Sequence, residues 1–198
     1  RDLANLKALR AALGEDAELM ADANQAWTLG QALEEAPRLE PFGLRWLEEP
    51  LRADRFWDEW RALSGKTRSP LAAGENLAGA DAFEAALAAG ALAVVQPDVA
   101  KWGGFSGCLP VAKRILAAGR RYCPHWLGGG IGLLASAHLL AAAGGDGLLE
   151  VDANPNPLRT LTCGPLARVV DGLASLTGEP GLGAIPDLDA LREFAVSR

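Results

Sequence analysis

The chain has 198 residues, of which 49% are hydrophobic and 22% are charged, and its 25 acidic and 19 basic residues give a net charge of −6. This composition is typical of a folded globular protein, and the length favours one domain with a sizeable core. The acidic balance argues against a nucleic-acid-binding surface and against a polybasic membrane anchor. We therefore expect neither a nucleic-acid partner nor a membrane partner.

The cysteines indicate the cellular compartment, and the start of the chain indicates whether the sequence is part of a longer one. Three scattered cysteines are too few for a disulfide scaffold or a zinc ribbon, and no signal peptide is visible. We therefore expect a reducing, cytoplasmic location. The most apolar stretch, 127–145, is interrupted by polar residues and does not resemble a bilayer span. The chain opens at Arg1 within a helical pattern, without Met, so we expect it to be part of a longer polypeptide.

Short apolar runs alternate with amphipathic or alanine-rich stretches of helical length. Such alternation with short connections predicts a parallel sheet, because parallel neighbours need a crossover. In chain order we predict the helix Asp2–Leu13, the strand Glu18–Asp22, the helix Leu29–Leu39, the strand Leu44–Glu48, the helix Asp54–Leu63, the strand Leu71–Gly74, the helix Ala80–Ala89, the strand Ala93–Gln96, the helix Gly107–Ala118, the strand Arg121–Pro124, the helix Ile131–Ala143 and the strand Leu148–Glu150.

An ionisable residue stands at or just after the end of every predicted strand. The intervals between these residues are 26, 27, 23, 27 and 25, which is one βα unit each. In a (β/α)8 barrel such side chains converge on one mouth, whereas in an open sheet they would spread along an edge roughly 25 Å long. We therefore predict an α/β fold of the (β/α)8 type. The six residues are Asp22, Glu48, Glu75, Asp98, His125 and Glu150.

The predicted barrel is incomplete. Six βα units fall short of eight, and a complete barrel usually takes about 250 residues. We expect two further strands to come from a missing N-terminal part, or the sheet to stay open. We interpret 1–198 as a C-terminal barrel domain, with βα units in 1–160 and a tail in 161–198 that packs back on the barrel or on a missing cap.

Three of the acids, Asp22, Glu48 and Glu75, end consecutive strands. Three ionised carboxylates at one mouth repel each other unless their pKa values rise or a cation compensates them. Hard oxygen ligands without His or Cys suit Mg²⁺, with Mn²⁺ as a substitute. The alternative is that each acid ends its strand by chance, which the common phase of the three disfavours.

The other three strand-end residues suggest proton transfer. Asp98 ends the strand before His125, so the carboxylate can orient the imidazole as a general base. Glu150 completes the ring and could hydrogen-bond or protonate a developing oxyanion, or simply end a short strand. Lys101 could add positive charge near the mouth or be a solvated loop residue, and both interpretations stay open. Trp126 could line the pocket, or it could be an ordinary buried side chain of the core.

The motifs taken together resemble the enolase superfamily, and within it the mandelate racemase/muconate lactonizing enzyme family. That superfamily uses a Lys or His base with one or two Mg²⁺ ions. Each motif is weak alone, but six in order at barrel spacing are specific. The motifs are Asp22-Ala23-Asn24 with Trp27, Trp46-Leu47-Glu48-Glu49-Pro50, Gly74-Glu75-Asn76, Gln96-Pro97-Asp98 with Lys101 and Gly103-Gly104, Pro124-His125 and Leu149-Glu150, followed by Asp171-Gly172, Glu179-Pro180-Gly181-Leu182-Gly183 and Pro186-Asp187.

The resemblance implies a role for each strand-end residue. It makes Glu48 rather than Glu49 a metal ligand, because the family's ligand is the first acid of its Glu-Glu-Pro. The implied metal ligands are Asp22, Glu48 and Glu75, the implied dyad is His125 with Asp98, the implied electrophilic partner of the substrate carboxylate is Glu150, and the substrate-binding residues are Asn24, Lys101 and Trp126.

Glu as the third ligand and His on the next-to-last strand resemble the mandelate racemase and acid-sugar dehydratase branch. The family's Lys-x-Lys station on the second strand and its N-terminal capping domain have no counterpart in the chain. The resemblance implies Mg²⁺-dependent removal of the proton α to a small-molecule carboxylate, with dehydration of a sugar acid favoured over racemisation or epimerisation of a 2-hydroxy acid. We expect the complete protein to be a homo-oligomer.

One alternative comes from a different class of protein. Gly130-x-Gly132-x-x-Ala135 opens a predicted helix after a strand, and Glu150 lies 20 residues beyond Gly130, as in a dinucleotide-binding fingerprint. Against it, the motif lies far from the N-terminal βαβ unit where such fingerprints usually occur. It also leaves the other strand-end acids without a role.

Overall fold

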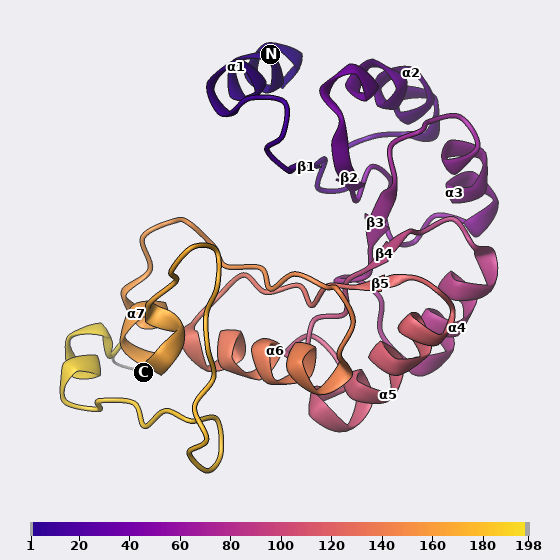
Figure 1. Ribbon diagram of the computed structural model, residues 1–198. Coiled ribbons are helices and arrows are strands. Elements are labelled where there is room, and N and C mark those ends of the chain that lie inside the picture. Colours follow the sequence, from indigo (N-terminus) through magenta and orange to yellow (C-terminus); the bar gives the residue numbers. More distant parts are fainter. Residues whose placement is uncertain (1, 197–198) are drawn as a thin grey trace.

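The computed structural model describes residues 2–196 as a curved, parallel five-stranded sheet with helices along its outer side (Figure 1). The architecture is that of an incomplete (β/α)8-type barrel, as predicted. Its elements are α1 (Asp2–Leu13), β1 (Leu19–Asp22), α2 (Leu29–Leu39), η1 (Glu40–Phe42), β2 (Leu44–Glu48), α3 (Trp57–Ser64), β3 (Leu71–Ala73), α4 (Ala80–Ala89), β4 (Val94–Val95), α5 (Gly104–Ala117), β5 (Arg121–Tyr122), α6 (Gly130–Ala143), α7 (Pro157–Thr162), η2 (Gly164–Ala167) and η3 (Ala190–Phe194).

The sheet grows strictly in chain order. Its strand order is β1-β2-β3-β4-β5, and all four neighbouring pairs are parallel. The helices follow the same rule, since each helix from α2 to α6 packs on the helix that comes next in the chain. This sequential arrangement brings the carboxyl ends of all five strands to one edge, where the predicted site residues stand.

Local sequence signals explain most helix bounds. The α2 helix begins with a capping box, in which the Thr28 hydroxyl accepts from the Gln31 backbone N–H and the Gln31 side chain accepts from the Thr28 N–H. The α3 helix begins at Trp57, not at the predicted Asp54, because Asp54 pairs with Arg52 in the turn before it. The α5 helix begins at Gly104, three residues earlier than predicted.

The predicted sixth strand at Leu148–Glu150 is wrong, because no backbone ladder joins this segment to β5 within the described residues. The Leu148 N–H donates to the Cys123 sulfur at 3.3 Å instead of to a carbonyl oxygen. A Cβ on Gly147 would lie 1.9 Å from the Tyr122 carbonyl oxygen, so this glycine allows a close approach. Side chains and a tight glycine contact therefore hold the segment beside β5.

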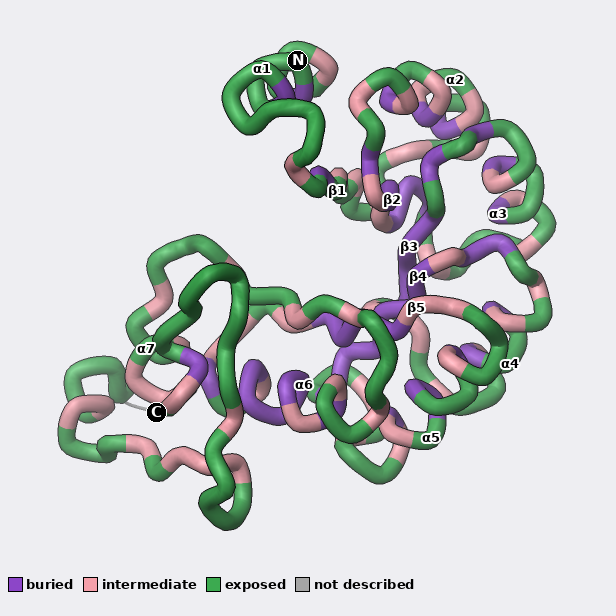
Figure 2. The backbone as a smooth tube through the Cα atoms, in the orientation of Figure 1, coloured by how far each residue is buried: buried purple, intermediate pink, exposed green. Residues whose placement is uncertain are grey.

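The core has two layers on either side of the sheet. The larger layer lies between the strands and the outer helices and includes Leu47, Trp60, Phe83 and Ile115. A smaller cluster comes from four successive strand segments on the inner side of the curve. Figure 2 shows buried residues along the strands and on the sheet-facing sides of the helices. The inner cluster consists of Trp46, Ala72, Val94 and Cys123.

The C-terminal segment packs on α6. Leu166 and Cys163 form a buried cluster with Leu133 and Leu134 of α6, and Leu182 packs against that cluster. Residues 1, 197 and 198, which the predicted domain range includes, lie outside the described residues. Within 2–196, no helix combines the length and apolar character needed to cross a bilayer. The three cysteines are free and buried.

Candidate active site

The strand-end residues lie on the edge that the parallel register defines. Asp22 of β1 and Glu48 of β2 are register partners. The ladder continues past both strands, since the Ala23 N–H donates to the Glu48 carbonyl and the Glu49 N–H to the Ala72 carbonyl, each at 2.9 Å. The first two predicted ligands therefore project from neighbouring positions of one sheet edge.

Unusual backbone geometry is concentrated at this edge. Among the residues that the structure describes, four non-glycine residues have positive φ, and three of them lie just after β1 or β2: Asn24 (45°), Gln25 (60°) and Glu49 (38°). Such conformations cost on the order of 1–3 kcal/mol and often mark functional sites. After β3, Gly74 has φ 147°, and a Cβ there would lie 2.6 Å from the Gln96 backbone nitrogen. The turn that places Glu75 therefore requires glycine.

His125 and Asp98 form the predicted pair. The imidazole Nδ1 lies 2.7 Å from an Asp98 carboxylate oxygen, and both residues are buried, at 7% and 5% exposed. The Asp98 carboxylate also accepts from the backbone N–H groups of Ala100 and Lys101, at 2.8 and 3.0 Å. These three contacts fix the carboxylate, which in turn fixes the plane of the ring.

The second imidazole nitrogen of His125 faces two further carboxylates. Nε2 lies 2.6 Å from Glu75 and 4.0 Å from Glu150. Burial opposes protonation of His125, but hydrogen bonds to Asp98 and Glu75 outweigh it and raise the pKa of His125 to about 10. Burial likewise raises the pKa of Glu75, but hydrogen bonds from His125 and Lys101 outweigh that effect and lower the pKa to about 2. The His125 ring thus lies among three carboxylates, those of Asp98, Glu75 and Glu150.

Glu48 and Glu150 have the opposite electrostatics. Burial raises the pKa of Glu48, the negative charges of Asp22 and Glu75 raise it further, and hydrogen bonds from Gln96 and the Trp46 indole only partly oppose this. Burial also raises the pKa of Glu150, whose carboxylate accepts from the Trp126 N–H at 2.8 Å. Carboxyl groups with raised pKa values stand beside groups with lowered ones, an arrangement typical of active sites.

The donor set suits Mg²⁺ in its chemistry, since Asp22, Glu48 and Glu75 all offer carboxylate oxygens from consecutive strand ends. As arranged, however, no three acidic, His or Cys side chains in residues 2–196 are close enough together to hold an ion. Glu75 is turned toward His125 and Lys101. Ion binding by the three predicted ligands would therefore need their side chains to move closer together, and the ligand assignment stays a prediction.

The three predicted substrate-binding residues have different surroundings. Asn24 donates from its backbone and its side chain to the Asp22 carboxylate, at 2.6 and 3.4 Å. Lys101 places its ammonium group 2.9 Å from Glu75. The Trp126 indole donates to the Gly129 carbonyl at 2.9 Å. Asn24 and Lys101 thus contact predicted ligands directly, and their substrate role stays a prediction.

The glycines of the dinucleotide-binding alternative have packing roles. A Cβ on Gly130 would lie 2.2 Å from the Cys163 backbone nitrogen, and one on Gly132 would lie 2.0 Å from the Trp126 ring. Both glycines are therefore required where α6 meets α7 and Trp126, without any bound dinucleotide. His138 lies in α6 with its Nε2 3.2 Å from the Leu182 carbonyl oxygen.

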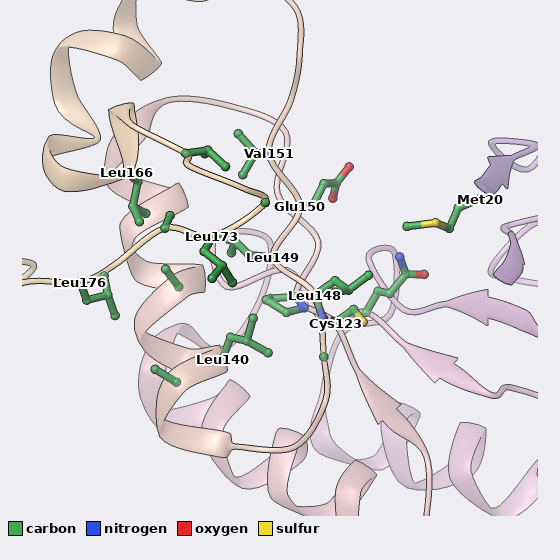
Figure 3. Close-up of a pocket in the computed structure, with 18 of the residues that line it drawn as sticks. Met20, Cys123, Leu140, Leu148, Leu149, Glu150, Val151, Leu166, Leu173 and Leu176 are labelled. Atoms are coloured by element: carbon green, nitrogen blue, oxygen red, sulfur yellow. Dashed lines mark hydrogen bonds between the residues drawn. The ribbon is translucent and has the colours of Figure 1, made fainter. Parts of the chain in front are cut away.

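A cavity of about 810 Å³ opens on the inner side of the sheet. Glu48, Gln96 and Glu150 bring polar groups to a lining that is otherwise largely apolar. Figure 3 shows Met20 of β1 on one side of this cavity and Leu148, Glu150 and Leu173 on the other. Of the strand-end carboxylates, those of Glu48 and Glu150 therefore face this cavity.

Three further polar residues lie at this edge, Glu49, Asn76 and Gln96, which belong to the sequence motifs but received no predicted role. Gln96 is 4% exposed, and its side-chain oxygen has no hydrogen-bond partner within the described residues. Strand alternation could have found it, since it lies two residues before Asp98 and shares its face. Glu49 and Asn76 are 27 residues apart, the same interval as Glu48 and Glu75.

Comparison with known proteins adds an independent finding to this geometry. The sequence model of the family described as Enolase C-terminal domain-like matches residues 1–190. The chain belongs to this family. Among curated relatives of this enolase-type domain, the D-galactarolactone cycloisomerase of Agrobacterium fabrum is 33% identical over 98% of the chain and 53% of its own length. Other curated relatives are dehydratases and a racemase.

Solved structures of enolase-type proteins match the fold closely. A mandelate racemase/muconate lactonizing enzyme from Bordetella bronchiseptica has a TM-score of 0.94 and 59% identity over 98% of the chain and 54% of its own. An L-talarate dehydratase from Polaromonas, solved with Mg and L-glucarate, has a TM-score of 0.81 and 30% identity over 94% and 49%. The chain spans about half the length of the curated relatives it matches.

Proposed function

We propose that this enolase-type domain carries the proton-transfer site of a Mg²⁺-dependent enzyme that removes the proton α to a carboxylate and dehydrates a sugar acid. The observation that carries the proposal is His125, buried between Asp98 and Glu75 with Glu150 at 4.0 Å. The dehydratases among the relatives, and the one solved with Mg and L-glucarate, support the same class of reaction.

Each residue has a distinct task in this proposal. Asp98 orients the His125 ring through Nδ1, and Nε2 accepts the α-proton once the Glu75 carboxylate has left it, which also removes one of the hydrogen bonds that raise the pKa of His125. Glu150, whose pKa burial raises, donates a hydrogen bond to the developing oxyanion in its protonated form. Asp22, Glu48 and Glu75 would hold the Mg²⁺ ion. When bound, Mg²⁺ supplies positive charge that stabilises the dianion formed on deprotonation.

Dehydration needs only one proton carrier, because the same residue can act first as a base and then as an acid. His125 takes the α-proton and then returns it to the departing β-hydroxyl group, so that water leaves and an enol remains. The enol tautomerises to a 2-keto acid. Racemisation instead requires a second base on the opposite face of the substrate. Within the described residues, His125 is the imidazole held at this edge by two carboxylates.

Cycloisomerisation is a second candidate, favoured by the match to D-galactarolactone cycloisomerase over 98% of the chain. The proton abstraction would be the same, and the leaving oxygen would belong to a ring of the substrate instead of to a hydroxyl group. The residues His125, Asp98 and Glu150 would keep their tasks. The two candidates therefore differ in substrate, not in the proton-transfer site.

The experiment is a proton NMR assay of the complete protein in D2O with Mg²⁺ and a panel of sugar acids and lactones that includes L-glucarate. Dehydration predicts a keto acid formed from an open-chain sugar acid with loss of water, and cycloisomerisation predicts a keto acid isomeric with the lactone from which it forms. Racemisation predicts α-deuteration with formation of an epimer. The His125→Asn variant is the control for each. If no panel member reacted or exchanged its α-hydrogen while Mg²⁺ bound, the proposal would be wrong.

A further inference from the structure

Glu49 is a buried acid that the proposed reaction does not use. Its side chain follows directly after the predicted ligand Glu48, yet it is only 2% exposed, and its backbone has a φ of 38°. A buried carboxylate is costly unless hydrogen bonds satisfy it. Its partners therefore indicate why this position holds an acid.

The Glu49 side chain connects the segments that follow β1 and β3. Both of its oxygens accept from the Asn76 side-chain amide, at 2.9 and 3.1 Å, and it also accepts from the Gln25 side chain. Gln25 is itself fixed, because its side-chain oxygen accepts from the Ala53 N–H at 2.9 Å and its own N–H donates to the Glu49 carbonyl at 2.7 Å. Glu49 is thus anchored on one side and contacts Asn76 on the other.

Asn76 carries this constraint to the site. Its amide nitrogen also donates to the Glu75 carboxylate at 3.0 Å, and an amide has two hydrogens, so it can face both carboxylates at once. Its oxygen lies 3.4 Å from the Lys101 ammonium group, which in turn contacts Glu75. One amide therefore contacts both the anionic and the cationic member of the Glu75–Lys101 pair.

We propose that Glu49 is a positioning residue, which acts through Asn76 to hold the Glu75 carboxylate and the Lys101 ammonium group at the strand ends. The inference rests on the proposed function where it treats Glu75 as a ligand of Mg²⁺. Positioning needs hydrogen-bond acceptors at residue 49, not a negative charge. A ligand or a charge-based role for Glu49 would need the carboxylate itself.

The first test compares Mg²⁺ binding by isothermal titration calorimetry in the parent chain, Glu49→Ala and Glu49→Gln. Glu49→Ala removes the acceptors and should weaken binding at least about fivefold, which corresponds to about 1 kcal/mol. Glu49→Gln keeps one acceptor oxygen and should stay within about twofold of the parent, as expected for a neutral acceptor. Glu34→Ala, which removes an exposed acid on α2, controls for the change in net charge.

Equal losses in Glu49→Ala and Glu49→Gln would overturn the inference in favour of a charge or ligand role, and no loss in either would overturn it outright. Asn76→Ala and the double variant complete a cycle: if the two residues act through one contact, the double variant binds no more weakly than the weaker single variant. Additive losses would contradict the inference. Asn76→Ala also serves if Glu49→Ala fails to fold.

A second readout separates this inference from the proposed function. The Asn76 side-chain amide resonances in a ¹⁵N NMR spectrum should shift in Glu49→Ala and stay near their parent positions in Glu49→Gln, with or without Mg²⁺. Unchanged resonances in Glu49→Ala would overturn the positioning role. If the parent chain bound no Mg²⁺ but the resonances moved as expected, the metal site would fail while the positioning of Asn76 would stand.

Discussion

His125 shows how single residues set the chemistry of this edge. Its two ring nitrogens face Asp98 and Glu75 at 2.7 and 2.6 Å, so a carboxylate lies at each end of the ring. The Asp98 contact is compatible with proton transfer because it uses Nδ1 and leaves Nε2 for the substrate. The Glu75 contact occupies Nε2, so the proposed reaction requires Glu75 to leave the ring. Residues that bind Glu75 elsewhere therefore influence whether His125 is accessible.

The His125→Asn variant separates proton transfer from metal binding. Asn cannot take up a proton near neutral pH, so turnover and α-hydrogen exchange in D2O should fall by about 10²–10⁴, the usual contribution of a positioned acid or base. Mg²⁺ affinity should not fall, because the variant removes an imidazole that competes for Glu75. NMR exchange and calorimetry measure the two effects. A variant that lost its metal together with its activity would contradict the assignment.

The Glu75→Gln variant tests the predicted ligand set. The substitution removes one negative charge at nearly constant shape, so Mg²⁺ binding measured by calorimetry should weaken at least about tenfold, or about 1.4 kcal/mol. Glu84→Gln removes the same charge from α4 on the outer side of the sheet and should leave binding unchanged. Unaltered affinity in Glu75→Gln would show that the ligands lie elsewhere.

The candidate site residues that recur at strand-end intervals could be predicted from the sequence. The residues that form hydrogen bonds around them could not. The spacing of Asp98 and His125 predicted their contact, because both follow adjacent parallel strands. The Glu49–Asn76 contact could not be predicted from strand alternation, because it depends on the positive φ at Glu49, which changes the side-chain direction after β2. Nor does the spacing show that Glu75 turns toward His125, since that choice depends on the local charges.

At the scale of elements, the sequence predicted the bounds of helices that depend on local sequence signals. It did not predict the elements whose position depends on tertiary contacts. The periodicity gave α1, α2 and α4 with the bounds that the structure shows. The sixth strand failed because Gly147 and Leu148 contact Tyr122 and Cys123 through a tight glycine approach and a sulfur acceptor. The short helix α7 was not predicted, since its position depends on contacts with α6.

The start of α6 gives a prediction at this scale. In Gly130→Ala the new Cβ would lie 2.2 Å from the Cys163 nitrogen and 2.5 Å from the Arg159 carbonyl oxygen. Both are backbone atoms, so α7 must move, and we expect a loss of about 2 kcal/mol in the free energy of unfolding, within the usual range for overpacking. Urea denaturation followed by circular dichroism measures this loss.

Gly30→Ala is the matched control for that prediction. Gly30 lies in α2, and a Cβ there meets nothing within 4 Å, so the substitution should raise the free energy of unfolding by up to about 1 kcal/mol through helix propensity alone. If both variants changed stability equally, close packing of α6 on α7 would not be what requires glycine at position 130.

At the scale of the whole molecule, the three cysteines belong to three different hydrophobic clusters. Cys108 belongs to a cluster between α5 and α6, Cys123 to the inner layer of the sheet, and Cys163 to the cluster where the C-terminal segment meets α6. All three are buried, and burial raises the pKa of each, together with the Asp98 charge at Cys108, where the pKa reaches about 11. The thiolate is the reactive form of cysteine. Burial therefore protects each thiol in two ways, because reagents reach it poorly and because it stays protonated.

We therefore expect the native protein to react slowly with a disulfide reagent at pH 8, and all three thiols to react at once in denaturant. Cys163 should be modified first under native conditions, because it lies outside the sheet in the C-terminal segment. Mass spectrometry of peptides from partly modified protein gives the order. Initial labelling of Cys108 or Cys123 would mean that the sheet opens before the C-terminal segment does.

The strictly sequential packing of strands and helices has a consequence for how the molecule comes apart. When every unit touches only the units before and after it, the free energy of the whole approaches a sum of unit terms and nearest-neighbour coupling terms, as in a one-dimensional Ising chain. For the 198-residue chain by itself, opening then costs least at the two edges of the five-stranded sheet, where a strand has a single neighbouring strand. Amide hydrogen exchange should accordingly show protection that rises from β1 and from β5 toward β3, so that the turn carrying Glu75 lies in the slowest-exchanging part of the sheet.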